Sequence, residues 1–204
     1  MENRKYYSEQ ALESIARRTI KAYDPTLLLD NPRAIPIENI IERDFGLSVE
    51  YQYIRKNGRI LGVTDFDDDI VPIYDMDLHE YILMEFKRGT IIIDASLLHC
   101  PNDGRLRFTC AHELAHWLLH QELYSGSGDI ASMTENVKKS TDVDKAIEWQ
   151  ADKLGSDLLM PSGQVKIAYY RLRDKTNDII APLAEQFNVS KQAMEIKLKA
   201  RHLI

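Results

Sequence analysis

Three residues in one short stretch have the types and the spacing of a metal site. His112, Glu113 and His116 belong to the sequence His-Glu-Leu-Ala-His. Residues four apart on a helix project from the same face, so both imidazoles can bind one zinc ion. Glu113 then lies beside the water held by the ion, where it can act as a base. The stretch predicts a hydrolytic zinc site; the alternative is a pair of unrelated histidines on a surface helix.

A catalytic zinc ion needs a third protein ligand, which this helix does not supply. In the metzincin form of the motif, the third ligand is a histidine further along the same segment. That form requires glycine at 119 and histidine at 122, where the chain has Leu119 and Glu122. His120 is also unsuitable, because residues eight apart on one helix are separated by about 12 Å along its axis. The third ligand must therefore come from another element.

Glu148 is the best candidate for this third ligand, and Asp152 follows it one helical turn later. Such a pair is typical of zinc sites in which a glutamate completes the ligand set. Asp152 would accept a hydrogen bond from a ligand imidazole, most plausibly that of His112, and so fix its tautomer. The alternative is that Glu148 and Asp152 form a solvated helical face. The other candidate ligands are Asp142, Asp144 and Asp157.

Peptide hydrolysis at such a site also needs a group that stabilises the oxyanion. The sequence does not select one, and the candidates for this role or for the cleft wall are Tyr124, Tyr169, Tyr170, Arg171 and His120. The strand-like run 90–94 precedes the metal helix. It could line the cleft and pair with an extended peptide, or it could be a buried core strand.

Hydrophobic periodicity predicts the elements that position these residues. Helices are expected at 8–23, 36–45 and 144–160, with two more from residue 179, and strands at 47–53, 60–64, 70–74, 81–86 and 90–94. Residues 56–58 and 87–89 are expected to form hairpin turns, and the polar residues 125–140 a mobile loop, a candidate lid. We therefore predict an α+β fold in which a small mixed or antiparallel sheet packs on the metal helix.

Composition indicates a soluble globular protein. The chain has 204 residues, 44% hydrophobic and 28% charged, and no apolar run approaches the roughly 18 residues of a membrane span. The N-terminus lacks an apolar signal core, and the two cysteines form no CxxC pair. These features predict a cytoplasmic protein that does not interact with membranes.

Charge is distributed unevenly along the chain, whose net charge is −6. Residues 166–204 carry eight Lys or Arg against four Asp or Glu, a balance of +4. This asymmetry predicts a partner-binding face at the C-terminal end. We expect residues 1–165 to form the core, with its N-terminal helices, and residues 166–204 to form a helical subdomain packed on it.

Two longer motifs resemble the ImmA/IrrE metallo-endopeptidases. One is Arg105-Leu-Arg-Phe-Thr-Cys-Ala-His-Glu-Leu-Ala-His-Trp-Leu-Leu-His120, and the other is Glu148-Trp-Gln-Ala-Asp-Lys-Leu-Gly-Ser-Asp-Leu-Leu-Met-Pro161. Residues 183–198 are similar, more weakly, to the family's helical C-terminal part. Gly155 and Ser156 depart from the family pattern, which often has Phe-Ala there.

The resemblance implies a zincin-like metalloprotease fold, a Zn²⁺ cofactor, the ligands His112, His116 and Glu148, and a catalytic Glu113. It also implies that the substrate is a DNA-binding transcriptional repressor, often of the helix-turn-helix type. The competing hypothesis is a non-proteolytic, metal-stabilised regulator. Such a protein would bind a partner or DNA through its C-terminal helices, whose second helix has Lys191, Lys197, Lys199 and Arg201 on or near it.

Overall fold

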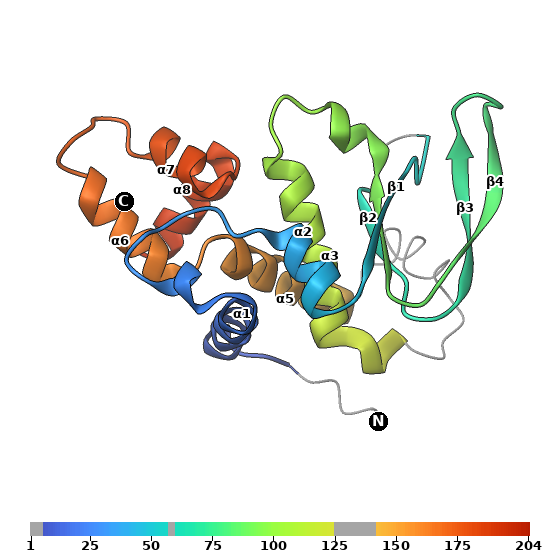
Figure 1. Cartoon of the computed structure of the whole chain (residues 1–204), viewed down its shortest axis with the longest axis horizontal. Helices are drawn as coiled ribbons and strands as arrows, with labels where there is room; N and C mark the ends of the chain where they lie inside the picture. Colours follow the sequence, from blue (N-terminus) through green and yellow to red (C-terminus); the bar gives the residue numbers. More distant parts are fainter. Residues whose placement is uncertain (1–5, 57–59, 125–141) are drawn as a thin grey trace.

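The computed structural model describes residues 6–56, 60–124 and 142–204. Helix α3 lies between a helical half of the molecule and a half made of two small sheets (Figure 1). The helices are α1 (Glu9–Tyr23), α2 (Ile37–Asn39), α3 (Gly104–Tyr124), α5 (Asp142–Leu159), α6 (Ser162–Leu172), α7 (Ile180–Phe187) and α8 (Lys191–Ala200). The strands are β1 (Ser48–Gln52), β2 (Gly62–Thr64), β3 (Asp69–Asp75), β4 (Glu80–Phe86) and β5 (Thr90–Asp94). The predicted α+β class is confirmed.

The N-terminal helices begin and end where their signals predict. The hydroxyl of Ser8 accepts a hydrogen bond from the Ala11 amide, which caps α1. Helix α2 is short and continues as a π-helical segment, Ile40–Asp44. Gly46 follows with a φ of 64°, the left-handed conformation that glycine adopts most readily after a helix. The predicted loop at 125–140 lies outside the described residues.

Strand β5 is the central strand of a three-stranded mixed sheet. It pairs in parallel with β1 and antiparallel with β2. Ile91 and Ile93 belong to the core on the α3 side, whereas Ile92 packs in a second cluster on the opposite face. All five residues of β5 are buried because both faces are covered. The strand is therefore a core strand with both edges paired, and the idea that it pairs with a peptide is wrong.

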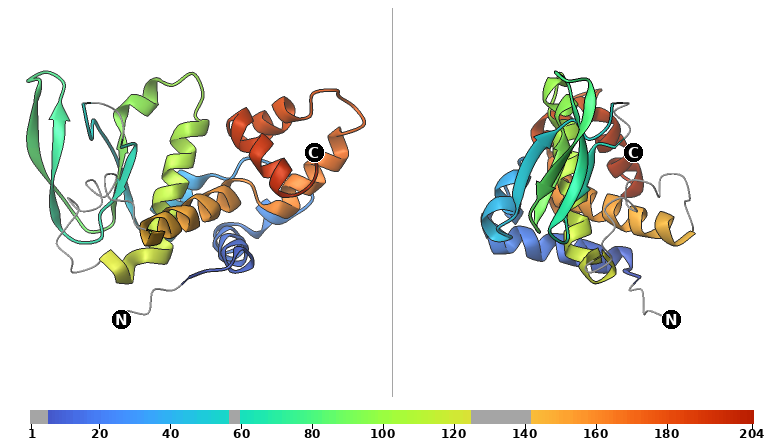
Figure 2. Two further views of the ribbon diagram at one scale, coloured as in Figure 1. Left: turned by 180° about the vertical axis from the view of Figure 1, so that it is seen from behind. Right: turned by 90° about the vertical axis from the view of Figure 1, so that its right-hand side faces the viewer.

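The two predicted hairpin turns do not join paired strands. Strands β1 and β2 are separated by β5, so the segment around Lys56 does not close a hairpin; residues 57 and 58 lie outside the described range. Gly89, at a φ of 84°, connects β4 to β5, which belong to different sheets. The observed hairpin is β3–β4, which covers the sheet face opposite α3 (Figure 2).

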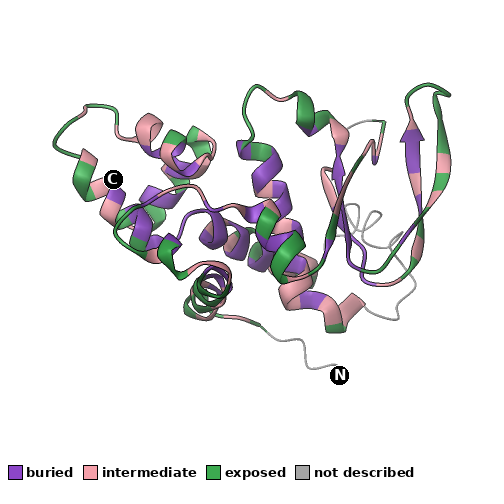
Figure 3. Ribbon diagram, in the orientation of Figure 1, coloured by how far each residue is buried: buried purple, intermediate pink, exposed green. Residues whose placement is uncertain are grey.

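The helical half shares one core with the sheet. Its buried residues run from Leu12 in α1 to Leu198 in α8, and the buried face of α3 includes Cys110 and Leu114 (Figure 3). The predicted boundary at 165/166 falls inside α6. Among the described residues, no helix is both long and apolar enough to cross a bilayer.

Arg107 anchors the start of α3. Its buried guanidinium donates hydrogen bonds to the backbone carbonyls of Ile35 and Asn188 and pairs with Glu38 at 3.4 Å. Ile35 precedes α2, Glu38 lies in α2, and Asn188 lies between α7 and α8. Because a buried cation requires such partners, Arg107 fixes the C-terminal helices relative to the helix that carries the histidines.

Asp65, directly after β2, is buried without full hydrogen bonding. Its Oδ1 accepts a hydrogen bond from the Asp67 amide, but among the described residues Oδ2 has no partner. Burial is the main reason that the pKa of Asp65 rises to about 7. The folded state therefore holds a proton that the unfolded chain releases near pH 4. The unfolding free energy must fall as the pH rises from about 4 to 7.

We expect Asp65→Asn to remove this pH dependence. One pKa unit corresponds to about 1.4 kcal/mol, and pH 5 lies about two units below the pKa of Asp65, so the variant should gain about 2–3 kcal/mol relative to wild type between pH 5 and pH 8. Urea unfolding at both pH values measures the difference. Asp68→Asn is the matched control, because Asp68 is exposed, and the hydrogen bond from the Arg88 amide together with the nearby Lys87 lowers its pKa. An equal gain in both variants contradicts the interpretation.

Candidate metal centre

His112 and His116 on α3 and Glu148 on α5 direct their donor atoms at one point. The two histidine Nε2 atoms lie 3.0 Å apart. The Glu148 carboxylate oxygens lie 3.3 Å from His112 Nε2 and 3.5 Å from His116 Nε2. In a tetrahedral zinc site with metal–ligand distances of about 2.0–2.1 Å, the donor atoms are about 3.3–3.4 Å apart. The three donors therefore fit a single small divalent cation.

Each histidine has a polar partner on its other ring nitrogen. His112 Nδ1 lies 2.9 Å from Asp152 Oδ1, so the ring donates its proton to the carboxylate and leaves Nε2 free to bind a cation. His116 Nδ1 lies 3.0 Å from His120 Nδ1. The two orientations leave both Nε2 atoms facing Glu148.

His120 does not line the cleft wall, which is one of the roles that the sequence leaves open for it. It is 1% exposed, and it contacts the outer nitrogen of His116. Burial and the neighbouring His116 lower the pKa of His120 to about 3, so the ring is neutral. A neutral ring can accept the His116 proton, so His120 orients a candidate ligand and is not placed to stabilise an oxyanion.

The electrostatics of the cluster favour a positive charge at its centre. Burial opposes protonation of His112, but the hydrogen bonds to Asp152 and Glu148 outweigh it and raise its pKa to about 10. For Glu148, the contacts with both histidines outweigh burial and hold its pKa below its usual range. A divalent cation satisfies the same charge requirement in place of the proton.

Gly155 brings α5 close enough to α3 for Glu148 to reach the histidines. A Cβ atom at this position would lie 3.2 Å from the backbone nitrogen of His112 and 3.3 Å from the carbonyl carbon of Ala111. Such contacts are tighter than ordinary packing and involve backbone, which cannot move aside easily. The departure from the family pattern at this position therefore lies directly behind His112, a candidate ligand.

Glu113 lies beside the edge strand β2, a contact that sequence reasoning missed. Its Oε2 accepts a 2.7 Å hydrogen bond from the Thr64 hydroxyl, and both residues are buried. A Cβ atom on Gly62 would lie 2.6 Å from Glu113 Oε1, so only glycine fits there. Gly62 inside a predicted strand was the available signal, because such a glycine often marks a close approach.

The remaining candidate residues lie elsewhere. Asp157 is buried and pairs with Lys153 and Lys197, so it is not a ligand, and Asp142 pairs with Lys145. Tyr124 stacks on Phe66 with ring centroids 5.3 Å apart. Helix α6, which carries Tyr169, Tyr170 and Arg171, lies in the helical half at a distance from the middle of α3 (Figure 1). The structure does not bring these three residues to the cluster.

A mixed α+β fold with two histidines and a glutamate on facing helices is the arrangement of a metallopeptidase-type centre. Residues 73–199 match the peptidase M78 family model, described as the IrrE N-terminal-like domain. The match covers more than half of the chain, so the chain belongs to this family. The membership suggests a metallopeptidase and implies a metal ion.

The fold also resembles a solved structure. A Mycobacterium tuberculosis transcriptional regulator matches with a TM-score of 0.54 at 17% sequence identity. The match covers 95% of this chain and 47% of the regulator, so the chain spans about half the length of that protein. At this identity, the likeness concerns the fold alone. No curated protein matches the chain.

Proposed function

We propose that the chain is a zinc-dependent endopeptidase that cleaves a regulatory protein, with a helix-turn-helix transcriptional repressor as the substrate. The observation that carries the proposal is the set of donor–donor distances of 3.0, 3.3 and 3.5 Å among His112, His116 and Glu148. Family membership supports peptide hydrolysis, and a DNA-binding substrate would place the protein in the cytoplasm.

Each residue of the site has a separate role in the proposed peptide hydrolysis. When bound, zinc supplies a Lewis acid for the peptide carbonyl and a site at which water loses a proton near neutral pH. The Glu113 carboxylate takes the proton of the attacking water and passes it to the leaving amine. Thr64 holds this carboxylate through the 2.7 Å hydrogen bond, and Asp152 holds the ring of His112. The oxyanion-stabilising group is not among the α6 candidates.

Removal and return of the metal tests the proposal. The purified chain should contain about one zinc ion per molecule and should cleave a repressor encoded beside its own gene. A chelator such as 1,10-phenanthroline should abolish cleavage, and added zinc should restore it. Mass spectrometry of the metal and of the fragments gives the readout. Cleavage that survives complete metal removal contradicts the proposal.

We expect Thr64→Val to lower kcat about tenfold to a hundredfold without changing KM or zinc content. A hydrogen bond to a charged group contributes about 1.5–3 kcal/mol, and the variant leaves one Glu113 oxygen without its donor. Thr64→Ser retains the hydroxyl and should restore most of the activity. Steady-state cleavage assays with all three proteins measure the effect. If valine and serine behave alike, the hydroxyl does not position Glu113.

The alternative of DNA binding through the C-terminal helices has less support. Helices α7 and α8 are separated by the three residues Asn188, Val189 and Ser190, as the helix-turn-helix spacing predicts. However, Lys197 is buried against Asp157, and Arg201 pairs with Asp157 and Glu13. The cations on this helix are thus largely committed within the chain, and α8 packs as part of the core. We propose that residues 166–204 act as a helical subdomain that supports the peptidase core.

A further inference from the structure

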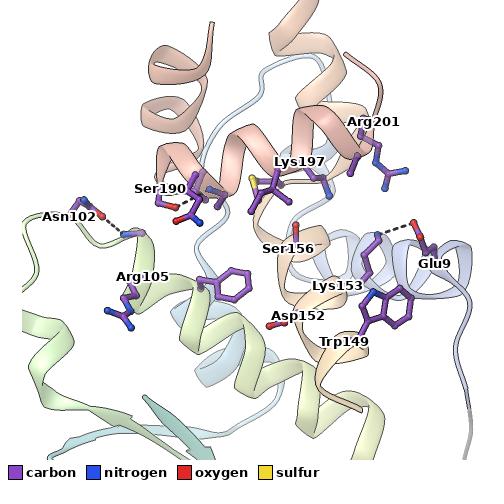
Figure 4. Close-up of a pocket in the computed structure, with 18 residues that line it drawn as sticks. Glu9, Asn102, Arg105, Trp149, Asp152, Lys153, Ser156, Ser190, Lys197 and Arg201 are labelled. Carbon is purple, nitrogen blue, oxygen red and sulfur yellow. Dashed lines mark hydrogen bonds and ion pairs between the residues drawn. The ribbon is translucent and has the colours of Figure 1, made fainter. Parts of the chain in front are cut away.

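A cavity of about 700 Å³ opens between the first half of α3, helix α5 and helix α8 (Figure 4). Its walls include Phe108 from α3, Trp149 from α5, Met160 just after α5, and Ile196 from α8. Trp149 is 37% exposed and Ile196 is 60% exposed, so large apolar surfaces on α5 and α8 are open to solvent. The volume is in the range of cavities that enclose small ligands or peptide side chains. We call this cavity the α3–α8 groove.

The α3–α8 groove lies beside the proposed metal centre, on the Nδ1 side of His112. Asp152, whose carboxylate lies 2.9 Å from His112 Nδ1, is one of its lining residues. Phe108 is another, and its ring centroid lies 6.4 Å from that of His112. A polypeptide bound at the metal centre can therefore reach the groove by passing Asp152 toward the N-terminal end of α3.

The dimensions of the groove correspond to a short peptide segment. Arg105, at its far end, precedes His112 by seven residues, which corresponds to about 10 Å along the helix. An extended chain rises about 3.3 Å per residue. The groove therefore has room for about three residues beyond the metal centre.

The charges along the groove indicate what it recognises. Lys153, Lys197 and Arg201 all pair with the buried Asp157. Arg105 is exposed, and in the described part of the chain no carboxylate lies within ion-pair distance of its guanidinium. The groove thus offers apolar walls and one available cation at its far end.

We propose that the α3–α8 groove binds about three residues of the substrate polypeptide on one side of the cleaved bond, that these residues are apolar, and that an acidic residue follows them beside Arg105. This assignment rests on the proposed function, because it takes the metal centre to be the point of cleavage. It defines the substrate class as polypeptides with a short apolar segment followed by an acidic residue.

A binding experiment tests the groove without requiring activity. Trp149 reports on the groove if Trp117 is replaced, so the full chain carries Trp117→Phe and Glu113→Gln. Titration with the peptide acetyl-Leu-Phe-Leu amide should shift the Trp149 emission saturably to shorter wavelength, whereas acetyl-Ser-Thr-Ser amide should not. Ile196→Glu should weaken this binding at least tenfold. Leu83→Glu is the matched control, because Leu83 is 74% exposed on β4 and does not line the groove.

A cleavage-site profile tests the same assignment through the reaction. The zinc-loaded chain is incubated with a proteome-derived peptide library, and cuts also made by Glu113→Gln are subtracted. Three adjacent positions on one side of the cut should be enriched in apolar residues, followed by Asp or Glu. Arg105→Glu should change that last preference to Lys or Arg, and Ile196→Glu should reduce cleavage at apolar sites at least tenfold.

The two experiments separate failure of the groove from failure of the proposed function. If the apolar peptide binds selectively and Ile196→Glu abolishes this binding, the groove is supported. This holds even if no library peptide is cut, a result that would contradict the proposed function. Cleavage without an apolar preference, unaffected by Ile196→Glu, overturns the groove but leaves the peptidase. Equal binding of both tripeptides also overturns the groove.

Discussion

Replacing Glu113 by Gln should lower kcat/KM for the protein substrate between about a hundredfold and ten-thousandfold, the range that a general base contributes. Glutamine keeps the shape of the side chain but cannot take a proton from water at neutral pH. The effect should fall on kcat, because the proton moves only as the reaction proceeds. Fragment formation over time, measured at several substrate concentrations, gives both constants.

Zinc content and thermal stability should stay unchanged in this variant. Glu113 does not belong to the cluster of donor atoms on His112, His116 and Glu148. Loss of activity together with intact metal binding distinguishes a base from a structural residue. A Glu113→Gln protein that cleaves at the wild-type rate rejects the assignment of this glutamate as the base.

Glu148→Ala should weaken zinc binding by more than a hundredfold. Even changes to residues that only orient the ligands cost about tenfold to a hundredfold in metal affinity, and this change removes a ligand itself. Cleavage at micromolar zinc should be lost in parallel. Competition against a chromophoric chelator measures the affinity. The metal-free fold should be unaffected, because the Glu148 side chain is 57% exposed.

Asp142→Ala is the matched control for this experiment. Asp142 lies in the first turn of the same helix, carries the same charge and is one of the alternative ligands that the sequence leaves open. Its side chain is fully exposed and pairs only weakly, at 3.2 Å, with Lys145. Zinc affinity should remain at the wild-type value. If the two variants lose zinc equally, general charge and not coordination by Glu148 holds the ion.

The sequence predicts the parts of this fold that depend on local spacing. The pattern of Leu12 and Ile20 in α1, with Ser8 as its cap, is complete within one helix and needs no information from elsewhere. The same holds for the two histidines, since their separation alone places them on one face of α3. Glu148 and Asp152 could be proposed because they too lie one turn apart.

Pairing between distant strands could not be predicted in this way. The turn signals at residues 56–58 and 87–89 are local and indicate hairpins, yet β5 enters between β1 and β2 from 26 residues beyond the end of β2 at Thr64. Strand order depends on which apolar faces can be covered at the same time. Here both faces of β5 are covered, by α3 on one side and by the β3–β4 hairpin on the other.

Contacts that cross between elements were also missed. Thr64 and Glu113 are 49 residues apart, and no motif connects them, but the sheet order places β2 against α3. His120 could not be recognised as a partner of His116, because its burial depends on elements outside α3. The tyrosines of α6 were candidates for stabilising the oxyanion only because of their residue type. Helix α6 lies in the helical half, away from the metal centre.

The exposure of the side chains at the metal centre differs sharply between α3 and α5. The His116 side chain is 4% exposed, whereas those of Glu148 and Asp152 are 57% and 60% exposed. Among the described residues, the His116 imidazole thus faces the protein interior, whereas the α5 carboxylates face solvent. Chelators and competing cations can therefore approach from that side, so metal exchange should be fast. The fraction of the protein that is metal-loaded, and therefore active, would then depend on the concentration of free metal around it.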